Sequence, residues 1–334
     1  MDTSKFSIMA FGSILGTGGF ALASKAFLPF LVIPLTWVLV FFFSLFSAIF
    51  LVKLVLHPGI VKTELKHPLL GNFYALQPIS AVILAILCWN MIPSFIDLGL
   101  LVYGAGLILA LAIYLPYHFF SNIKIKLDQL HGGWFITPVA TILVTNAVLL
   151  YPVSAVTIVF ALLFFGIGTM LFLLILGMLF FRLVSHTLPT VELAPTNYIL
   201  LAPIGILIVD FMKISNSAGT LLKMNLSPFG ALGGAALWGF GIWAIGVNML
   251  FFRRYLKSGF QFNIGWWSYV FPTAAFTLGT ASLSNFFSPF KTISLFLYVC
   301  LTAVFIIVLL GSLKQILNPK KVRTISGASI FKNP

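Results

Sequence analysis

The stretch Trp266–Thr280, WWSYVFPTAAFTLGT, is the most informative part of the chain, because it lies inside an apolar run, 264–287, long enough to cross a bilayer. It carries Pro272 near its middle, with Phe271 directly before it and small residues after it. A proline removes a backbone donor and bends a helix, and within a membrane this is tolerated only where protein or water surrounds the bend. The stretch therefore predicts a membrane helix that other helices bury.

The composition supports a membrane protein throughout. Of the 334 residues, 60% are hydrophobic and only 7% are charged, which is too few charges for the surface of a soluble domain. The net charge of +13 does not indicate nucleic-acid binding, because the Lys and Arg residues lie at the ends of apolar runs. Cys88 and Cys300 both lie inside apolar stretches, so neither a disulfide framework nor a Cys-based metal site is expected.

Ten apolar segments have about the 18 residues or more that a bilayer requires. They are 6–24, 30–52, 73–92, 98–119, 134–151, 153–181, 195–212, 228–252, 264–287 and 293–313. No long hydrophilic stretch separates them. We therefore predict an all-α polytopic fold with one ten-helix transmembrane domain, residues 1–317, followed by a short basic cytoplasmic tail, residues 318–334.

The cationic residues predict the orientation of these segments. Fifteen lie on the N-terminal side of the predicted membrane: Lys5, Lys53, Lys62, Lys66, Lys124, Lys126, Arg182, Arg253, Arg254, Lys257, Lys314, Lys320, Lys321, Arg323 and Lys332. Four lie on the opposite side: Lys25, Lys213, Lys223 and Lys291. The positive-inside rule then places both termini in the cytoplasm. Because most loops on the opposite side are very short, the segments are predicted to form five helical hairpins.

The hairpins form a repeat. The first segment of four of them carries one proline at a similar depth, and successive prolines are 60, 65 and 69 residues apart. These prolines are Pro78, Pro138, Pro203 and Pro272. The first hairpin has a glycine cluster instead, GSILGTGG at 12–19, which includes Gly16. Both residue types let helices bend or approach each other closely.

This register predicts a pore. Five bent helices would surround an axis, with Gly16 and the four prolines as pore-lining kinks. Five more apolar helices would shield the bent helices from lipid. The alternative is that the prolines only adjust packing, since proline is common in transmembrane helices. Four prolines in register, all on the first segment of a hairpin, favour the pore.

The chemistry that the sequence lacks is equally informative. Only one acidic residue, Asp210, falls within an apolar run, two residues from its outer end, so no buried proton relay or sodium site is expected at mid-depth. The five histidines lie near the cytoplasmic ends of runs, where we expect them to cap helices. No catalytic triad and no metal-ligand spacing can be assembled, so we predict no enzyme, no metal and no cofactor. Fifteen cations around one mouth would favour anions over cations.

Four motifs resemble one family of membrane proteins. GTGGFALA (16–23), HPLLGNF (67–73), HGGWFITPVATI (131–142) and above all WWSYVFPTAAFTLGT are similar to the tellurite-resistance/dicarboxylate transporter family, which includes TehA-type channels and plant slow anion channels. The resemblance covers about residues 6–313. It implies a ten-helix protomer with five hairpins around its own pore, usually as a trimer, and a phenylalanine that blocks the pore. By its position before the proline, that phenylalanine corresponds to Phe271.

From the residues and this resemblance we predict an anion channel, or a channel-like passive transporter, in the plasma membrane of a prokaryote. Its partners would be the lipid bilayer, other protomers of a homotrimer, and small inorganic anions or C4-dicarboxylates, with no role for nucleic acid. One alternative is a proton-coupled dicarboxylate transporter or a sulfite exporter, in which the substrate itself carries the proton. An intramembrane enzyme acting on lipid is a further alternative, which the lack of any catalytic constellation disfavours.

Overall fold

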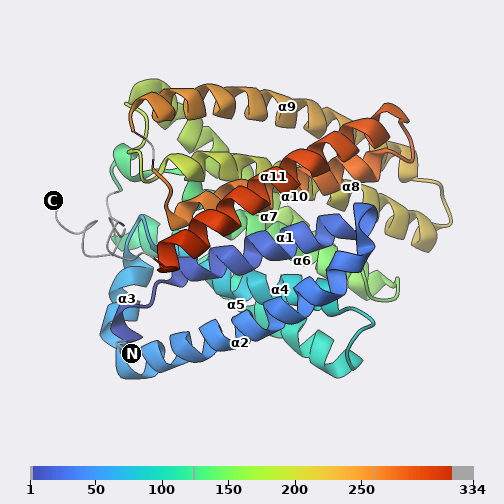
Figure 1. Ribbon diagram of the computed structural model, residues 1–334. Coiled ribbons are helices and arrows are strands. Elements are labelled where there is room, and N and C mark those ends of the chain that lie inside the picture. Colours follow the sequence, from blue (N-terminus) through green and yellow to red (C-terminus); the bar gives the residue numbers. More distant parts are fainter. Residues whose placement is uncertain (1–2, 123–124, 260, 318–334) are drawn as a thin grey trace.

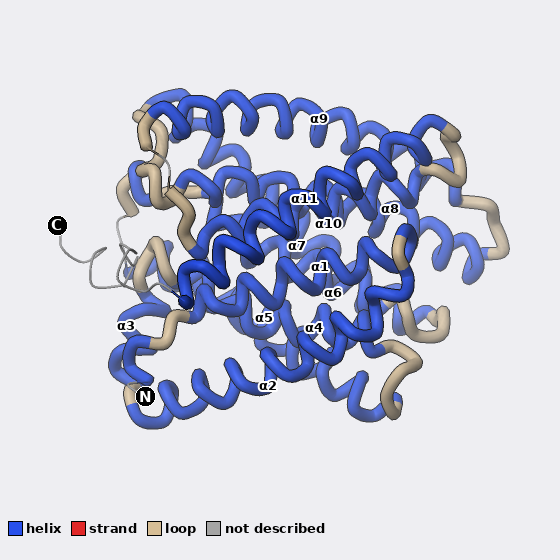
Figure 2. Tube along the Cα trace, viewed as in Figure 1, coloured by secondary structure: helices blue, strands red, loops and turns tan. Residues whose placement is uncertain are grey.

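The computed structural model describes residues 3–122, 125–259 and 261–317, and within these ranges every regular element is a helix (Figures 1 and 2). The α-helices are α1 (Phe11–Phe27), α2 (Val32–Leu56), α3 (Pro58–Lys66), α4 (Leu76–Cys88), α5 (Ser94–Asn122), α6 (Ile136–Val148), α7 (Ala155–Ser185), α8 (Leu201–Leu222), α9 (Ser227–Lys257), α10 (Trp267–Leu283) and α11 (Pro289–Leu317). The all-α class is confirmed. The predicted tail, 318–334, lies outside the described residues.

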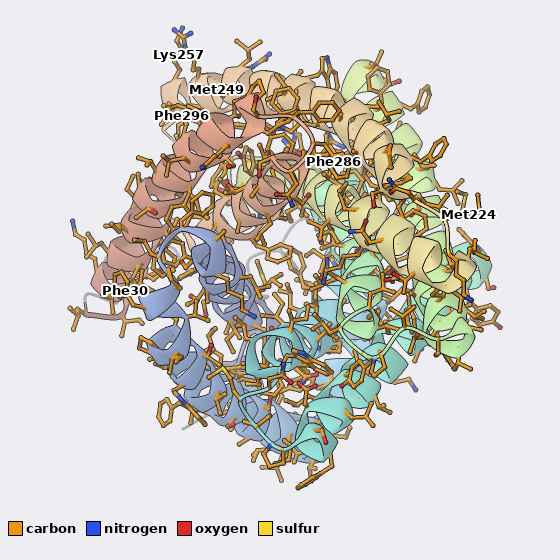
Figure 3. All side chains as sticks on the ribbon, turned by 90° about the vertical axis from the view of Figure 1, so that its right-hand side faces the viewer. Phe30, Met224, Met249, Lys257, Phe286 and Phe296 are labelled. Carbon is orange, nitrogen blue, oxygen red and sulfur yellow. The ribbon has the colours of Figure 1, made fainter. Side chains whose placement is uncertain are left out.

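The long helices form two concentric rings. Five of them, which we call the axial helices, make a closed ring in the order α1, α4, α6, α8 and α10, with α10 packed back against α1. Each axial helix is followed in the chain by a peripheral helix: α2, α5, α7, α9 or α11. Every peripheral helix packs on the axial helix before it and also contacts the next axial helix round the ring. Figure 3 shows this arrangement along the bundle.

Burial separates the two rings as the sequence predicts. The most apolar 18-residue window of 71–88, which contains α4, is 100% buried, whereas that of 29–56, which contains α2, is only 11% buried although it is more hydrophobic. Exposed apolar helices of this length are stable in lipid and not in water. Eight helical segments among the described residues are long and apolar enough to cross a membrane, which makes this a polytopic membrane protein.

Two of the ten predicted segments are not among those eight. Gly132–Val148 is apolar but has fewer residues, and 264–283 contains many small and polar residues. Both begin with a 3₁₀ stretch, Gly132–Phe135 and Ile264–Trp266. Because 3₁₀ helix rises about 2.0 Å per residue instead of 1.5 Å, the segment 132–148 reaches roughly 28 Å, close to the thickness of the hydrocarbon. The number of membrane crossings stays a prediction.

The end of the bundle at which α1 begins also holds α3, and we call it the α3 end (left in Figure 1). The sequence predicts a loop here, but 58–66 is helical and is held by a buried ion pair. Lys53 Nζ lies 2.8 Å from Glu64 Oε2 and donates to the Phe6 carbonyl, while the Tyr74 hydroxyl donates to the same carboxylate at 2.7 Å. These contacts join α2 and α3 to the 3₁₀ stretch Gly71–Ala75 that precedes α4.

The opposite end, where α1 ends at Phe27, extends further than predicted. Helix α8 runs to Leu222, ten residues past its expected end, and stops at Lys223, whose φ of 54° is the left-handed conformation typical of a helix cap. The polar sequence 214–220 interrupts the apolar run without interrupting the helix, since serine, asparagine and threonine are tolerated where a helix leaves the bilayer.

Candidate functional site: an axial path divided at Phe271

Two cavities lie inside the ring of axial helices. The narrow cavity, nearer the α3 end, has a volume of about 50 Å³, and the wide cavity, nearer Phe27, has a volume of about 370 Å³. All five axial segments line both of them. The narrow cavity is lined by Met9, Gly12, Leu15, Phe73, Leu76, Ile136, Val139, Ile199, Ile264, Gly265, Trp267, Ser268, Phe271 and Pro272. The wide cavity is lined by Gly19, Leu22, Lys25, Ala26, Ile86, Leu143, Asn146, Leu150, Ile206, Val209, Lys213, Phe271, Ala275, Leu278, Ala281 and Ser282.

Phe271 is the one described residue that lines both cavities. Its side chain is 5% exposed and lies against Gly19 of α1, where an added Cβ would come within 2.8 Å of the phenylalanine Cδ2 atom. Real side chains do not approach this closely, so the ring occupies its position because residue 19 has no side chain. An aromatic ring thus separates two spaces on the axis of the bundle.

The backbone of α10 explains how this ring is placed. Pro272 lies inside the α-helix and lines the narrow cavity, and its ring leaves the Ser268 carbonyl without the usual helical donor. The following turns carry threonines whose hydroxyls donate to the carbonyl four residues back: Thr273 to Tyr269 at 2.6 Å and Thr277 to Thr273 at 2.7 Å. Such back-bonding also bends helices, so the sequence favours a bent α10 at the level of Phe271.

The other three prolines occupy a different position. Pro78, Pro138 and Pro203 are each the third residue of an α-helix that continues a 3₁₀ stretch, so they lie where the helical winding changes. None of them lines either cavity among the described residues. The carbonyls of Pro78 and Pro138 instead face peripheral helices, at 2.8 Å and 3.2 Å from where a Cβ would lie on Gly104 and Gly168.

Gly16 also lies outside the lining of both cavities. A Cβ there would be 2.6 Å from Cε3 of Trp267, so this glycine allows α1 and α10 to pack closely. Gly205 does the same between α8 and α10, because its Cβ would meet the α10 backbone at Ala275 within 2.4 Å. Pore-lining roles for Gly16 and for the first three prolines stay predictions.

Two of the four cations predicted on the side opposite the termini, Lys25 and Lys213, line the wide cavity. Lys25 Nζ donates to the Ile86 carbonyl at 3.1 Å, and Lys213 Nζ donates to both the side-chain oxygen and the carbonyl of Asn146, at 2.5 Å and 3.2 Å. The described lining of the narrow cavity contains no charged residue. In the sequence each lysine directly follows the end of a predicted segment, 6–24 or 195–212, and the direction of its side chain depends on how α1 and α8 continue.

Two acidic residues are more deeply buried than predicted. Asp210 is 0% exposed, because α8 continues past it instead of ending beside it, and its Oδ1 accepts from Asn146 Nδ2 at 3.4 Å. Asp97 was expected outside the apolar runs, but it lies buried in the first turn of α5 and accepts a hydrogen bond from the Tyr151 hydroxyl at 2.9 Å. Both carboxyl groups thus lie inside the protein, while the expectation that none lies at mid-depth of the membrane stays a prediction.

One histidine, His131, caps a helix start as expected, and another, His67, ends α3 and accepts a hydrogen bond within the turn that follows. His67 Nδ1 accepts from the backbone N–H of Leu69, and His131 Nδ1 accepts from that of Gly133 at 3.0 Å, the same contact that the Asn263 side chain makes before α10. Burial lowers the pKa of His67, and burial together with the charge of Arg182 lowers the pKa of His131 to about 4. Both imidazoles are therefore neutral near pH 7.

Groups of histidine, cysteine and acidic residues that could hold a metal ion do not occur within the described ranges. The arrangement thus offers a path, an aromatic barrier and two ammonium groups. It brings Phe271 and Pro272 together on the axis, and it leaves the other predicted kinks in helix-packing contacts.

Comparisons with known proteins agree with this architecture. An uncharacterized transporter of Methanocaldococcus jannaschii is 27% identical over 81% of this chain and 82% of its own, and a second one from the same organism is 26% identical over 80% of each. A sulfite efflux pump of Arthroderma benhamiae is 25% identical over 80% of this chain and 78% of its own. The family model described as SLAC1, voltage-dependent anion channel, matches residues 5–313. The chain therefore belongs to the SLAC1 family of membrane transporters and channels.

Proposed function

We propose that this protein is a passive conduit for small anions, closed at Phe271. The observation that carries this proposal is that two cavities, each lined by all five axial segments, meet at one aromatic ring. A hydrophobic constriction excludes water and thereby excludes ions without needing a charge of its own. Rotation of the Phe271 side chain, or a change in the bend of α10, would join the cavities.

The proposed preference for anions follows from the charged residues that line the two cavities. Lys25 and Lys213 are the charged side chains among the described residues that line the path, and both are cationic. Cations in a low-dielectric cavity attract anions and repel cations far more strongly than the same groups do in water. Small inorganic anions and C4-dicarboxylates are the proposed solutes, and a relative named for sulfite efflux makes sulfite a third.

A second candidate function is coupled transport, in which a proton crosses with the anion. The observation that favours it is the buried carboxyl group of Asp210, which the Asn146 amide links to Lys213. Ionisable groups buried within membrane helices commonly lie on proton pathways.

Current recording from the purified protein in planar bilayers separates these functions. A passive conduit gives ohmic current whose reversal potential follows the anion gradient. This current is larger than that of a coupled transporter, which must change conformation for each anion that it carries. Slow flux that requires a pH gradient supports the coupled transporter. Current that follows the cation gradient excludes both.

We further propose that the α3 end faces the cytoplasm of a prokaryotic cell, with both termini there, and that protomers assemble as trimers. The first proposal rests on fifteen cationic residues against four, and the second on the family resemblance. A cysteine at Lys62 should then be protected from an impermeant reagent added outside intact cells, whereas a cysteine at Lys223 should react. The opposite pattern would reverse the orientation.

A further inference from the structure

We propose that Lys25, Lys213 and Asn146 form a binding site for a small dianion in the wide cavity. The inference rests on the proposed function, because it names the substrate class and the place where that substrate pauses beside Phe271. The three side chains come from three axial helices, α1, α8 and α6, and all three line the cavity.

The ammonium groups have hydrogen-bonding capacity to spare. Each lysine has three N–H donors. Lys25 uses one of them on the Ile86 carbonyl, and Lys213 uses two on the oxygens of Asn146. Three N–H donors are thus left without a protein acceptor within the described part of the chain, and they are available to a ligand that enters the cavity.

Electrostatics favours a doubly charged ligand. The two lysines line the same cavity, and the described lining of that cavity contains no carboxylate. Two cations that repel each other across an apolar space are stabilised more by one dianion than by one monoanion. At about 370 Å³ the cavity has the size of a small-molecule site, whereas the narrow cavity at about 50 Å³ holds little more than one water.

Asp210 explains how such a ligand can leave again. Its carboxyl group lies behind Asn146, whose Nδ2 donates to it while the Oδ1 of the same amide accepts from Lys213. When this carboxyl group is ionised, its charge opposes that of the lysines without occupying the cavity. Conduction requires binding that is weak enough to reverse, and a carboxylate one layer back from the site supplies this balance.

Binding is testable without any flux measurement. The purified full chain in detergent is titrated with succinate, sulfate or acetate at constant ionic strength, with gluconate as the balancing anion, and its Tm is followed. A ligand that binds only the folded state raises Tm in proportion to the logarithm of its concentration above Kd. We expect succinate and sulfate to raise Tm saturably and acetate to do so at least tenfold more weakly.

Variants assign the site. Lys25→Gln and Lys213→Gln should each raise the apparent Kd for the dianion at least tenfold, whereas Lys291→Gln, an exposed lysine outside the cavity, should leave it unchanged. The succinate and sulfate arms distinguish two separated carboxylates from one compact oxyanion. Equal binding of acetate and succinate, or an unchanged Kd in both cavity variants, overturns the proposal.

A second measurement applies even if the glutamine variants do not fold. Ser282 lines the same cavity, so in a Cys300→Ser background a Ser282→Cys protein should react more slowly with a neutral thiol reagent when succinate is present. An unchanged rate places succinate elsewhere and overturns the site. A protein that binds succinate through these lysines but passes no anion current would retain the site and refute the conduit.

Discussion

The narrow and the wide cavity are built by the same five helices, yet they differ in size and in charge. Toward the α3 end the axial segments begin with 3₁₀ stretches, and large apolar side chains such as Phe73 and Trp267 line the narrow cavity. Toward the other end small residues of α10, Ala275 and Ala281, face a space that also receives two lysines. The same repeated helix pairs therefore form an uncharged constriction at one end of the axis and a charged cavity at the other. The difference comes from which side chains of the axial helices face the axis at each end.

The largest effect is expected from a change to the aromatic ring of Phe271, which lies between the two cavities. Phe271→Ala would join the two spaces, and we expect anion current to rise several-fold, which corresponds to on the order of 1 kcal/mol or more off the permeation barrier. Selectivity for anions over cations should persist, because the lysines remain. Single-channel and macroscopic currents in bilayers measure both quantities.

Phe296→Ala is the matched control. This phenylalanine is 66% exposed on the peripheral helix α11, and Figure 3 shows it at the rim of the bundle. It should leave the current unchanged. If the correctly folded Phe271→Ala protein conducts like the wild type, the barrier lies at another residue.

A second test uses the neutral imidazole of His131, which lies at the same end of the bundle as the narrow cavity. His131 is buried at the α3 end with a pKa lowered from 6.5 to about 4. Between pH 6.5 and pH 4 the unfolded chain binds a proton on this imidazole that the folded chain does not, so folding stability falls as the pH falls through that window. At pH 5.5 this loss is about 1 kcal/mol.

His131→Asn should remove this loss, because asparagine provides the same acceptor that Asn263 provides for Gly265 before α10. Tm measured at pH 7 and pH 5.5 should drop less in this variant than in the wild type, since every other titrating group is common to both. Equal drops would show that protonation of His131 does not control acid stability.

The smallest expected effect concerns the proline repeat. Pro138→Ala should change conductance by less than about twofold by rate arithmetic, because the Pro138 carbonyl faces Gly168 of α7 and the side chain lines neither cavity. Pro272→Ala, at the wall of the narrow cavity, should change it more. Equal effects of the two substitutions would restore the prediction that all the prolines bend a pore.

Much of the architecture was predictable because hydrophobic length and charge placement are properties of each segment alone. The alternation of small-residue and greasier segments anticipated the buried and exposed rings, and the motif before Pro272 singled out Phe271. The position of Lys213 in the wide cavity and the burial of Asp210 were not predicted, for one reason. Apolar runs locate the ends of a membrane segment, whereas α8 continues as a helix through polar residues, and this continuation turns Lys213 and Asp210 toward α6.

The sequence by itself determined the class, the five-fold repeat of segment pairs and the motif that carries Phe271, because these depend on composition and spacing along the chain. Only the tertiary structure decided which residues share a cavity. Pro78, Pro138, Pro203 and Pro272 are equivalent in the sequence pattern, yet only Pro272 lines the axial path. The direction of a side chain depends on helix rotation, and rotation is set by close contacts between helices, such as Gly19 against Phe271 and Gly205 against α10.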